Sequence, residues 1–270
     1  MTAFVNHLSF EFRTGLRDKS LMLLNYFFPL GFYVLMGLLM IPINPGFRET
    51  IIPSLVVFAI LSGMILGLPN PLVAAREAGV FRSFKINGVP AISILVVPAL
   101  STILHVAVAA AIIALSAPFL FDAPPPQNWF GFVLVFLATA VAAAGLGVLI
   151  GVIAADSRSI VLWSQLIYLP SMMLGGLMFP TSLLPATLAP VAWLLPATYA
   201  MAGFQGLAQG QSVPFNPLWA VVILVAGGVL AFALAVYLFN WDNRNVTRRG
   251  HPLLALLAIL PYVLGSLLLR

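Results

Sequence analysis

Six long apolar stretches follow one another along the chain, and short polar segments separate them. Each has about 20 residues or more, the length that an α-helix needs to cross the hydrocarbon core of a bilayer. Prolines inside some stretches are acceptable there, because neighbouring helices satisfy the carbonyls that a proline leaves free. We therefore predict six membrane spans, at Leu21–Ile41, Ile51–Val73, Ala91–Leu115, Trp129–Ala154, Ile160–Phe179 and Leu218–Phe239.

Two further apolar segments do not fit this pattern. Thr181–Leu207 contains Pro185, Pro190 and Pro196, which divide it into short pieces. We interpret it as two short re-entrant helices at the outer face, with a kinked ordinary span as the alternative. Leu253–Leu269 has 17 residues, near the lower limit for a crossing. It is therefore either a seventh span or a helix that lies in the inner interface.

The composition agrees with a membrane protein. Of the 270 residues, 62% are hydrophobic and 7% are charged, whereas soluble domains have about 25% charged residues. This balance excludes a water-soluble enzyme, a disordered chain and a nucleic-acid-binding protein. The absence of cysteine excludes disulfides and thiolate metal sites. The fold class that we expect is an all-α polytopic membrane protein.

The positions of the basic residues predict the orientation. With the N-terminus inside, 10 of the 12 basic residues fall on the inner side and Arg48 falls outside. If Thr181–Leu207 crossed the membrane, three of these residues would move outside, which favours the re-entrant interpretation. The inner set is Arg13, Arg17, Lys19, Arg76, Arg82, Lys85, Arg158, Arg244, Arg248 and Arg249.

Two inner segments have amphipathic patterns. Residues 4–19 predict a helix in the headgroup plane, with Phe4, Val5, Leu8, Phe12 and Leu16 on its apolar face. Its other face carries His7, Glu11, Arg13, Thr14, Arg17 and Asp18. This helix is an anchor or, in addition, an element that transmits motion.

Residues 73–86, between the second and third spans, predict a short helix. Val73, Val80, Phe81 and Phe84 share one face with Glu77, while Arg82 and Lys85 point the other way. Exposed aromatic side chains in the cytosol favour a partner groove. An ordinary helix that rests on lipid has the same pattern, and the spacing alone leaves both interpretations open.

Two stretches resemble signatures of the ABC-2 type transporter permease family. REAGVF at 76–81, followed by GVP at 88–90, is similar to the charged segment after the second span, although Val80 stands where threonine is common. The sequence after the fifth span is similar to the family signature of glycine, Phe-Pro, proline and Pro-x-Thr-Tyr. It contains Gly175, Gly176, Phe179, Pro180, Pro185, Pro196 and Tyr199. The resemblance covers about residues 10–242, and the tail from residue 250 has no counterpart in the usual six-span pattern.

The resemblance implies a domain organisation and partners. We expect an interfacial helix over 1–20, a six-span domain over 21–240, and a cytosolic linker with an extra apolar segment over 241–270. A separate ATP-binding cassette ATPase, in two copies, would contact a coupling helix through Arg76, Glu77, Gly79, Val80, Phe81, Arg82, Phe84 and Lys85. Phe4, Leu8, Phe12, Arg13, Leu16 and Arg17 would flank this contact. The chain has no phosphate loop, so ATP and Mg²⁺ belong to the partner, and this chain itself needs no cofactor. A second permease copy, most simply a homodimer, completes the assembly.

The chemistry within the six spans narrows the function. None of them holds an acidic or basic residue well inside, and His105 is the only ionisable side chain there. Ion-coupled carriers usually keep such residues, and the scattered acids and histidines do not form a membrane enzyme's metal site. We expect an exporter of hydrophobic or amphipathic molecules in a bacterial plasma membrane. Export of a lipid-linked glycan and an ion-coupled secondary carrier are the alternatives. The resemblance implies a substrate path near Phe27, Phe28, Tyr33, Met36, Tyr168, Met172 and Met173.

Overall fold

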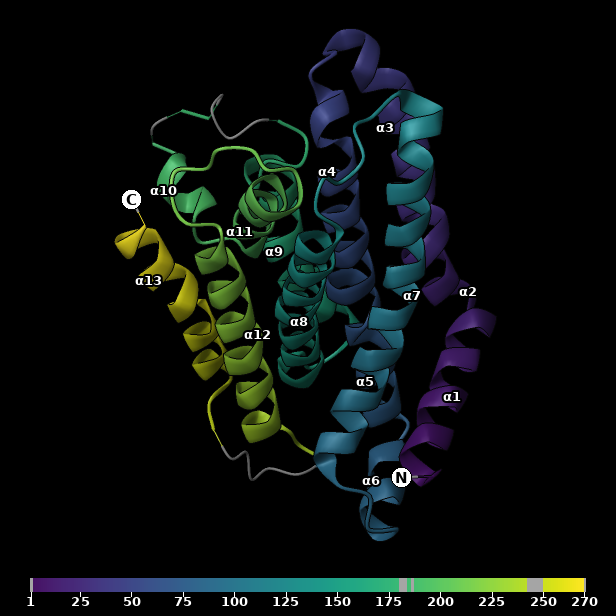
Figure 1. The fold of residues 1–270 in the computed structure, drawn as a ribbon. Coiled ribbons are helices and arrows are strands. Elements are labelled where there is room, and N and C mark those ends of the chain that lie inside the picture. The colour runs from purple at the N-terminus through teal and green to yellow at the C-terminus, as the bar shows by residue number, and fades with distance from the viewer. Residues whose placement is uncertain (1, 180–183, 186, 242–249, 270) are drawn as a thin grey trace.

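The computed structural model describes residues 2–179, 184–185, 187–241 and 250–269, and all regular structure within these ranges is helical. The longer helices run up and down in an elongated bundle (Figure 1). The elements are α1 (Thr2–Arg17), α2 (Lys19–Met22), η1 (Leu23–Phe27), α3 (Phe28–Ile43), α4 (Phe47–Leu61), η2 (Ser62–Gly67), α5 (Pro69–Glu77), α6 (Val80–Ile86), α7 (Ala91–Phe121), α8 (Trp129–Ile153), α9 (Ser157–Leu174), α10 (Ala189–Ala192), α11 (Pro196–Gly203), η4 (Phe204–Ala208), α12 (Leu218–Leu238), η5 (Pro252–Ile259) and α13 (Leu260–Leu268).

Five helical stretches among the described residues are long and apolar enough to cross a membrane. They match five predicted spans, and they are Lys19–Ile43, Phe47–Glu77, Ala91–Phe121, Trp129–Ile153 and Leu218–Leu238. The predicted span Ile160–Phe179 corresponds to α9, which has 18 residues and begins with the polar sequence Ser-Arg-Ser. The structure therefore confirms an all-helical membrane architecture, while the count of six spans stays a prediction.

One stretch, Phe47–Glu77, occupies the centre of the bundle. It comprises α4, the π-helical turn η2 and α5, and 94% of its most apolar stretch of 18 residues is buried. Helix α8 approaches η2 very closely at Gly147, where an added Cβ atom would lie 2.0 Å from the carbonyl oxygen of Met64. Only glycine permits this distance, because any side chain would separate the two helices.

Helices α8 and α12 also meet backbone to backbone. A Cβ atom at Gly145 would lie 2.2 Å from the carbonyl oxygen of Gly228, and one at Gly228 would lie 2.5 Å from that of Val141. Small residues at such a crossing allow close van der Waals contact, which drives association of helices in lipid. Gly145 and Gly228 are therefore the residues that let α8 and α12 approach this closely.

Capping residues determine where α9 begins. The Asp156 carboxylate accepts a hydrogen bond from the Ser159 amide at 2.8 Å, and the Ser159 hydroxyl lies 3.1 Å from the Asp156 amide. This reciprocal pair satisfies amides that have no partner within the helix. The bond from the Ser159 amide, followed by that from its side chain, lowers the pKa of Asp156 below its ordinary value.

The C-terminal segment Pro252–Leu268 follows α12 back toward the α10 end of the bundle (Figure 1). The Tyr262 ring packs at Gly227, where a Cβ atom would lie 2.4 Å from its hydroxyl oxygen. Gly265 abuts Ile223 and Tyr199. The segment therefore lies alongside the bundle and not flat beneath it, which is the direction that a seventh span would take.

The segment after α9 contains the short helices α10 and α11, followed by η4. All eight residues of α11 are buried, and α11 packs against α4, α8, α9 and α12. Protein thus covers this broken helical backbone, which is the condition for irregular backbone at membrane depth. The re-entrant path stays a prediction, and Thr181 and Pro180 lie outside the described residues.

Candidate functional site

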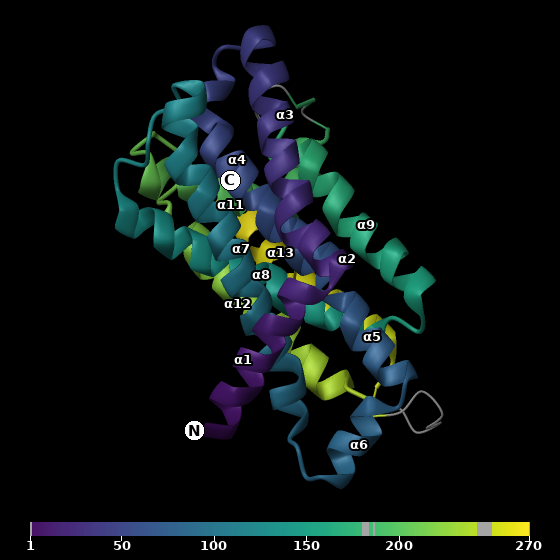
Figure 2. The same cartoon turned by 90° about the vertical axis from the view of Figure 1, so that its right-hand side faces the viewer.

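Helices α5 and α6 form the narrow end of the bundle that also carries α1 (Figures 1 and 2). Gly79 separates them with φ of 75°, a left-handed conformation that favours glycine. A Cβ atom at Gly79 would meet nothing within 4 Å, so the backbone angle, and not crowding, requires this glycine. The segment 73–86, predicted as a single helix, therefore belongs to two helices, and the side chains of α5 and α6 do not share one face.

Arg76 links α5 to the end of α8. Its side chain is buried, and its guanidinium donates hydrogen bonds to the carbonyl oxygens of Val152 at 2.8 Å and Gly151 at 3.4 Å, and also to that of Ala154. The last carbonyls of a helix have no partner within it, and a cation is favourable at this end of the helix dipole. Arg76 was predicted as part of a partner contact, and the structure directs its side chain into the bundle.

The predicted exposure of Phe81 is wrong. Its side chain is buried and its ring lies 5.5 Å from the Phe239 ring, because the turn at Gly79 directs it toward the end of α12. Phe84 is half-buried beside His7, with ring centroids 6.4 Å apart. Of the residues predicted to contact a partner, five are exposed: Glu77, Gly79, Val80, Arg82 and Lys85.

Helix α1 lies obliquely beside the lower part of α7 (Figures 1 and 2). The Phe12 ring stacks on the buried His105 ring at 4.3 Å, and the Tyr26 hydroxyl lies 2.8 Å from His105 Nδ1. Gly15 permits this approach, since a Cβ atom there would lie 2.5 Å from His105 Nε2. His105 thus joins α1 to the first and third spans.

The predicted apolar face of α1 divides in two. Phe12 and Leu8 are partly buried, whereas Phe4, Val5 and Leu16 are exposed, as are Arg13 and Arg17 on the other side. Exposed apolar and basic side chains on one helix are typical of contact with the headgroup region. The interfacial placement of α1 stays a prediction.

A cavity of about 270 Å³, which we call the α1–α6 cavity, lies among α1, α2, η1, α5, α6 and α7. Glu11 and His7 line it, and their side chains approach to 3.8 Å. Burial raises the pKa of Glu11 above its ordinary value, and the nearby His7 opposes this shift. Sequence analysis gave no sign of this cavity, because it depends on how six elements meet.

At the opposite end, the predicted outer motif positions α11. Gly175 is close to Ser171 and Ala197, and Gly176 adopts φ of 86°. Pro196 begins α11, and the fully buried Tyr199 donates a hydrogen bond to the Tyr262 carbonyl at 3.0 Å. Phe179 and Pro185 are exposed, and Pro180 is not described. The motif therefore brings the α11 turn and the C-terminal segment together.

The residues of the predicted substrate path do not converge on one cavity in the described part of the chain. Phe28 and Tyr168 both approach Phe58 of α4, with ring centroids at 5.2 and 6.1 Å. Tyr33 is buried and lies 3.0 Å from the Ser116 hydroxyl on α7. Met36 and Met172 are buried as well, whereas Phe27 and Met173 are exposed on the surface of the bundle.

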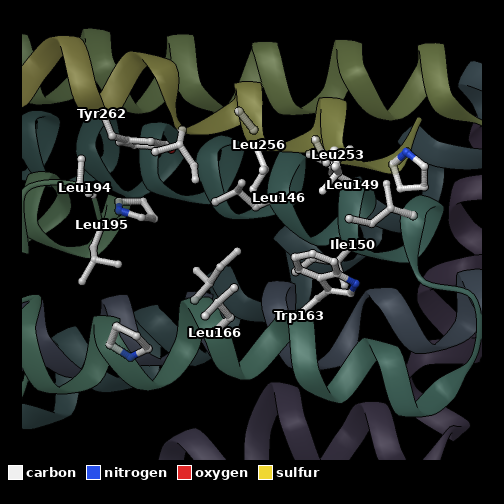
Figure 3. A pocket seen from close by; sticks show the side chains of 18 of the residues that line it. Leu146, Leu149, Ile150, Trp163, Leu166, Leu194, Leu195, Leu253, Leu256 and Tyr262 are labelled. Atoms are coloured by element: carbon white, nitrogen blue, oxygen red, sulfur yellow. The ribbon is translucent and has the colours of Figure 1, made fainter. Parts of the chain in front are cut away.

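An apolar pocket of about 320 Å³ lies between α9 and the C-terminal segment (Figure 3). Trp163 and Leu166 of α9 face Leu253 and Leu256 across it, and Leu149 of α8 contributes to its lining. Its walls include a segment that the six-span pattern lacks.

The comparisons with known proteins identify the family. The family model of the ABC-2 type transporter matches residues 2–208, which is more than half of the chain. A search of curated proteins and a search of solved structures found no match. The match includes α1, the α5–α6 segment and the outer motif, and it ends before α12. The chain therefore belongs to the ABC-2 type transporter family and is a membrane permease subunit of an ABC transporter.

Proposed function

We propose that this chain is the permease of an ATP-driven exporter that moves hydrophobic or amphipathic molecules across a bacterial plasma membrane. Two copies of it form a homodimer and work with two copies of a separate ATP-binding cassette ATPase. The observation that carries the proposal is the exposed, charged surface on α6 in a chain that belongs to the ABC-2 family. The family normally works with an ATP-binding cassette subunit.

The distribution of charge supports a cytosolic location for the α6 end. Arg82 and Lys85 belong to α6 at this end of the bundle, whereas Arg48 lies by the α3–α4 turn at the far end, 4.0 Å from Asp122 (Figure 1). Basic residues accumulate on the cytoplasmic side of membrane proteins. The N-terminus is then cytoplasmic as well.

The contacts around Arg76 and His105 suggest how motion passes from the ATPase to the spans. ATP binding closes the two ATPase subunits and displaces α6 as a rigid body. Arg76 transfers this displacement to α8 because it holds the carbonyl end of that helix. The stacked Phe12–His105 pair transfers movement of α1 to α7. The permeases then alternate between inward and outward access, and of the predicted path residues the exposed Phe27 and Met173 face the cargo.

Reconstitution into vesicles with the candidate ATPase tests the proposal. We expect uptake of a lipophilic dye into inside-out vesicles only when ATP is present. Glu77→Lys reverses a charge at the exposed end of α5, next to α6, so it should reduce ATPase co-purification and uptake. Glu49→Lys makes the same change at the exposed far end and serves as the matched control.

Two results would contradict the proposal. Uptake driven by a proton or sodium gradient without ATP would make the chain a secondary carrier. Equal ATPase binding and equal uptake for Glu77→Lys and Glu49→Lys would show that the α6 end is not the contact. Loss of uptake with both variants points to a general folding defect, which size-exclusion chromatography of each variant detects before transport is measured.

A further inference from the structure

The α1–α6 cavity is rich in hydrogen-bond acceptors. Glu11, Asp18 and Asn25 line it, and neither lysine nor arginine is among its described lining residues. Arg13 and Arg17 lie on the same helix as Glu11, but their side chains are exposed and not part of the lining. The cavity is therefore negative or neutral, although the surrounding end of the protein is basic.

Glu11 is a carboxyl group that lacks a permanent cationic partner. His7 is 3.8 Å away and is charged only when protonated. Partial burial penalises the ionised form and raises the pKa of Glu11. A cationic group in the cavity would remove this penalty, because an opposite charge favours the ionised carboxylate.

Asn25 stands in the wall of the cavity, but its amide oxygen is not accessible from it. The side chain is only 1% exposed, and its Oδ1 atom has no hydrogen-bond partner. A Cβ atom at Gly63 would lie 2.6 Å from this oxygen, which therefore faces η2. Glu11 and Asp18 are thus the acceptors that the lining offers to a cation.

The remaining lining residues suit the apolar part of a cationic ligand. Phe81 and Phe84 of α6 and Phe10 of α1 present aromatic rings, which attract cations through their faces. Leu68 and Leu72 provide aliphatic surface. The volume of about 270 Å³ is near the lower end of the ~300–1,000 Å³ typical of small-molecule pockets.

From the cavity, its carboxylate and its aromatic lining, we propose that the α1–α6 cavity binds a hydrophobic organic cation, such as an amphipathic amine, at the point where it enters the permease. Glu11 contacts the positive charge, and the α6 aromatics cover the apolar body. This rests on the proposed export function and names its substrate class. Because the cavity lies between α1 and α6, displacement of these helices changes its shape.

Binding can be measured on the full chain in nanodiscs without ATPase or ATP. The probe is a fluorescent N-methylstyrylpyridinium dye, and its uncharged styrylpyridine parent, at a pH where the parent stays neutral, is the matched ligand control. We expect saturable binding of the cation above the level of empty nanodiscs. Glu11→Gln should weaken it roughly 10- to 150-fold, because a contact with a charged group contributes about 1.5–3 kcal/mol and each 1.4 kcal/mol is a tenfold change in affinity. Glu49→Gln, which changes an exposed acid at the far end, should leave the affinity unchanged.

A steric test is independent of charge. Thr14→Trp fills the cavity from α1 and should abolish binding, whereas Ser9→Trp, on an exposed position outside the lining, should not. Equal affinity in Glu11→Gln and wild type, equal affinity for the neutral parent, or no binding above empty nanodiscs each overturns the inference. Since no ATPase is present, these results are separate from those that test ATP-driven export.

Discussion

Arg76→Met removes the charged group that holds the end of α8 and keeps an unbranched side chain of similar length. In wild type the guanidinium donates to Val152 and Ala154, with a longer contact to Gly151. After the change, these carbonyls at the C-terminus of α8 lose their donor. The C-terminal end of α8 is then less stable, and so is the packing of α5 against it.

The size of the effect follows from these contacts. Leaving a buried acceptor without its partner costs about 1–3 kcal/mol, and hydrogen bonds to charged groups lie at the upper end. Interhelical hydrogen bonds in membrane proteins average only ~0.6 kcal/mol, because the unfolded chain in lipid also finds partners. For two good bonds near the membrane surface we expect a loss of about 2 kcal/mol in the free energy of unfolding.

Equilibrium unfolding by dodecyl sulfate in mixed micelles, followed by tryptophan fluorescence, measures this loss. Lys85→Met is the matched control, because it removes the same charge from an exposed position on α6. Its stability should stay within about 0.5 kcal/mol of wild type. Arg76→Lys should lie between the two, since an ammonium cannot bind several carbonyls in the fixed geometry of a guanidinium. If Arg76→Met unfolds at the same dodecyl sulfate concentration as Lys85→Met, the capping role is refuted.

Three further results are expected. Gly145→Ala should destabilise the chain by about 1–3 kcal/mol in the same assay, because it forces α8 away from α12. Gly31→Ala is the control and should be neutral, since a Cβ atom there meets nothing within 4 Å. Equal stabilities of the two variants would contradict the close packing. Tyr199→Phe removes the bond to the Tyr262 carbonyl and should increase hydrogen exchange within 252–268, with a cost of ~1 kcal/mol, and unchanged exchange would speak against this link. Glu11→Gln should raise the stability of the protein at pH values above the pKa of Glu11. The folded-state pKa of this carboxyl is raised, so the wild-type protein loses stability as pH rises from 4.5, the ordinary pKa, through the folded-state pKa. The gain should therefore vanish below pH 4.5, and a gain at every pH would contradict the reasoning.

Sequence alone predicted the parts of this fold that depend on local composition. Long apolar runs are visible without tertiary information, so five predicted spans coincide with long apolar helices, with ends that differ by at most six residues. The prediction for Phe81 failed because a helical wheel assumes one continuous helix, and Gly79 breaks it with a left-handed turn. Its partner Phe239 comes from the far end of the chain, and no local pattern reveals such a contact.

At the candidate site too, local features could be predicted from the sequence and tertiary contacts could not. The charged segment around Glu77 was evident from its composition, but the inward direction of Arg76 depends on the end of α8. The α1–α6 cavity was not predicted, since its walls combine residues of α1, α2, α5, α6 and α7 with residues at the turns η1 and η2. Asn25 gave no sequence signal, because one asparagine in an apolar run is equally consistent with a satisfied hydrogen bond.

The buried central stretch Phe47–Glu77 has a mechanical consequence. With neighbours on all sides, it resists bending along most of its length, which at 1.5 Å per residue is about 45 Å. The π-helical turn Ser62–Gly67 departs from the regular α-helical ladder and contains two glycines, so deformation concentrates there. Under the proposed coupling, a push on α6 would therefore reach the opposite end of the bundle as a tilt of α4 about Ser62–Gly67, and the stiffness of those six residues would set its amplitude.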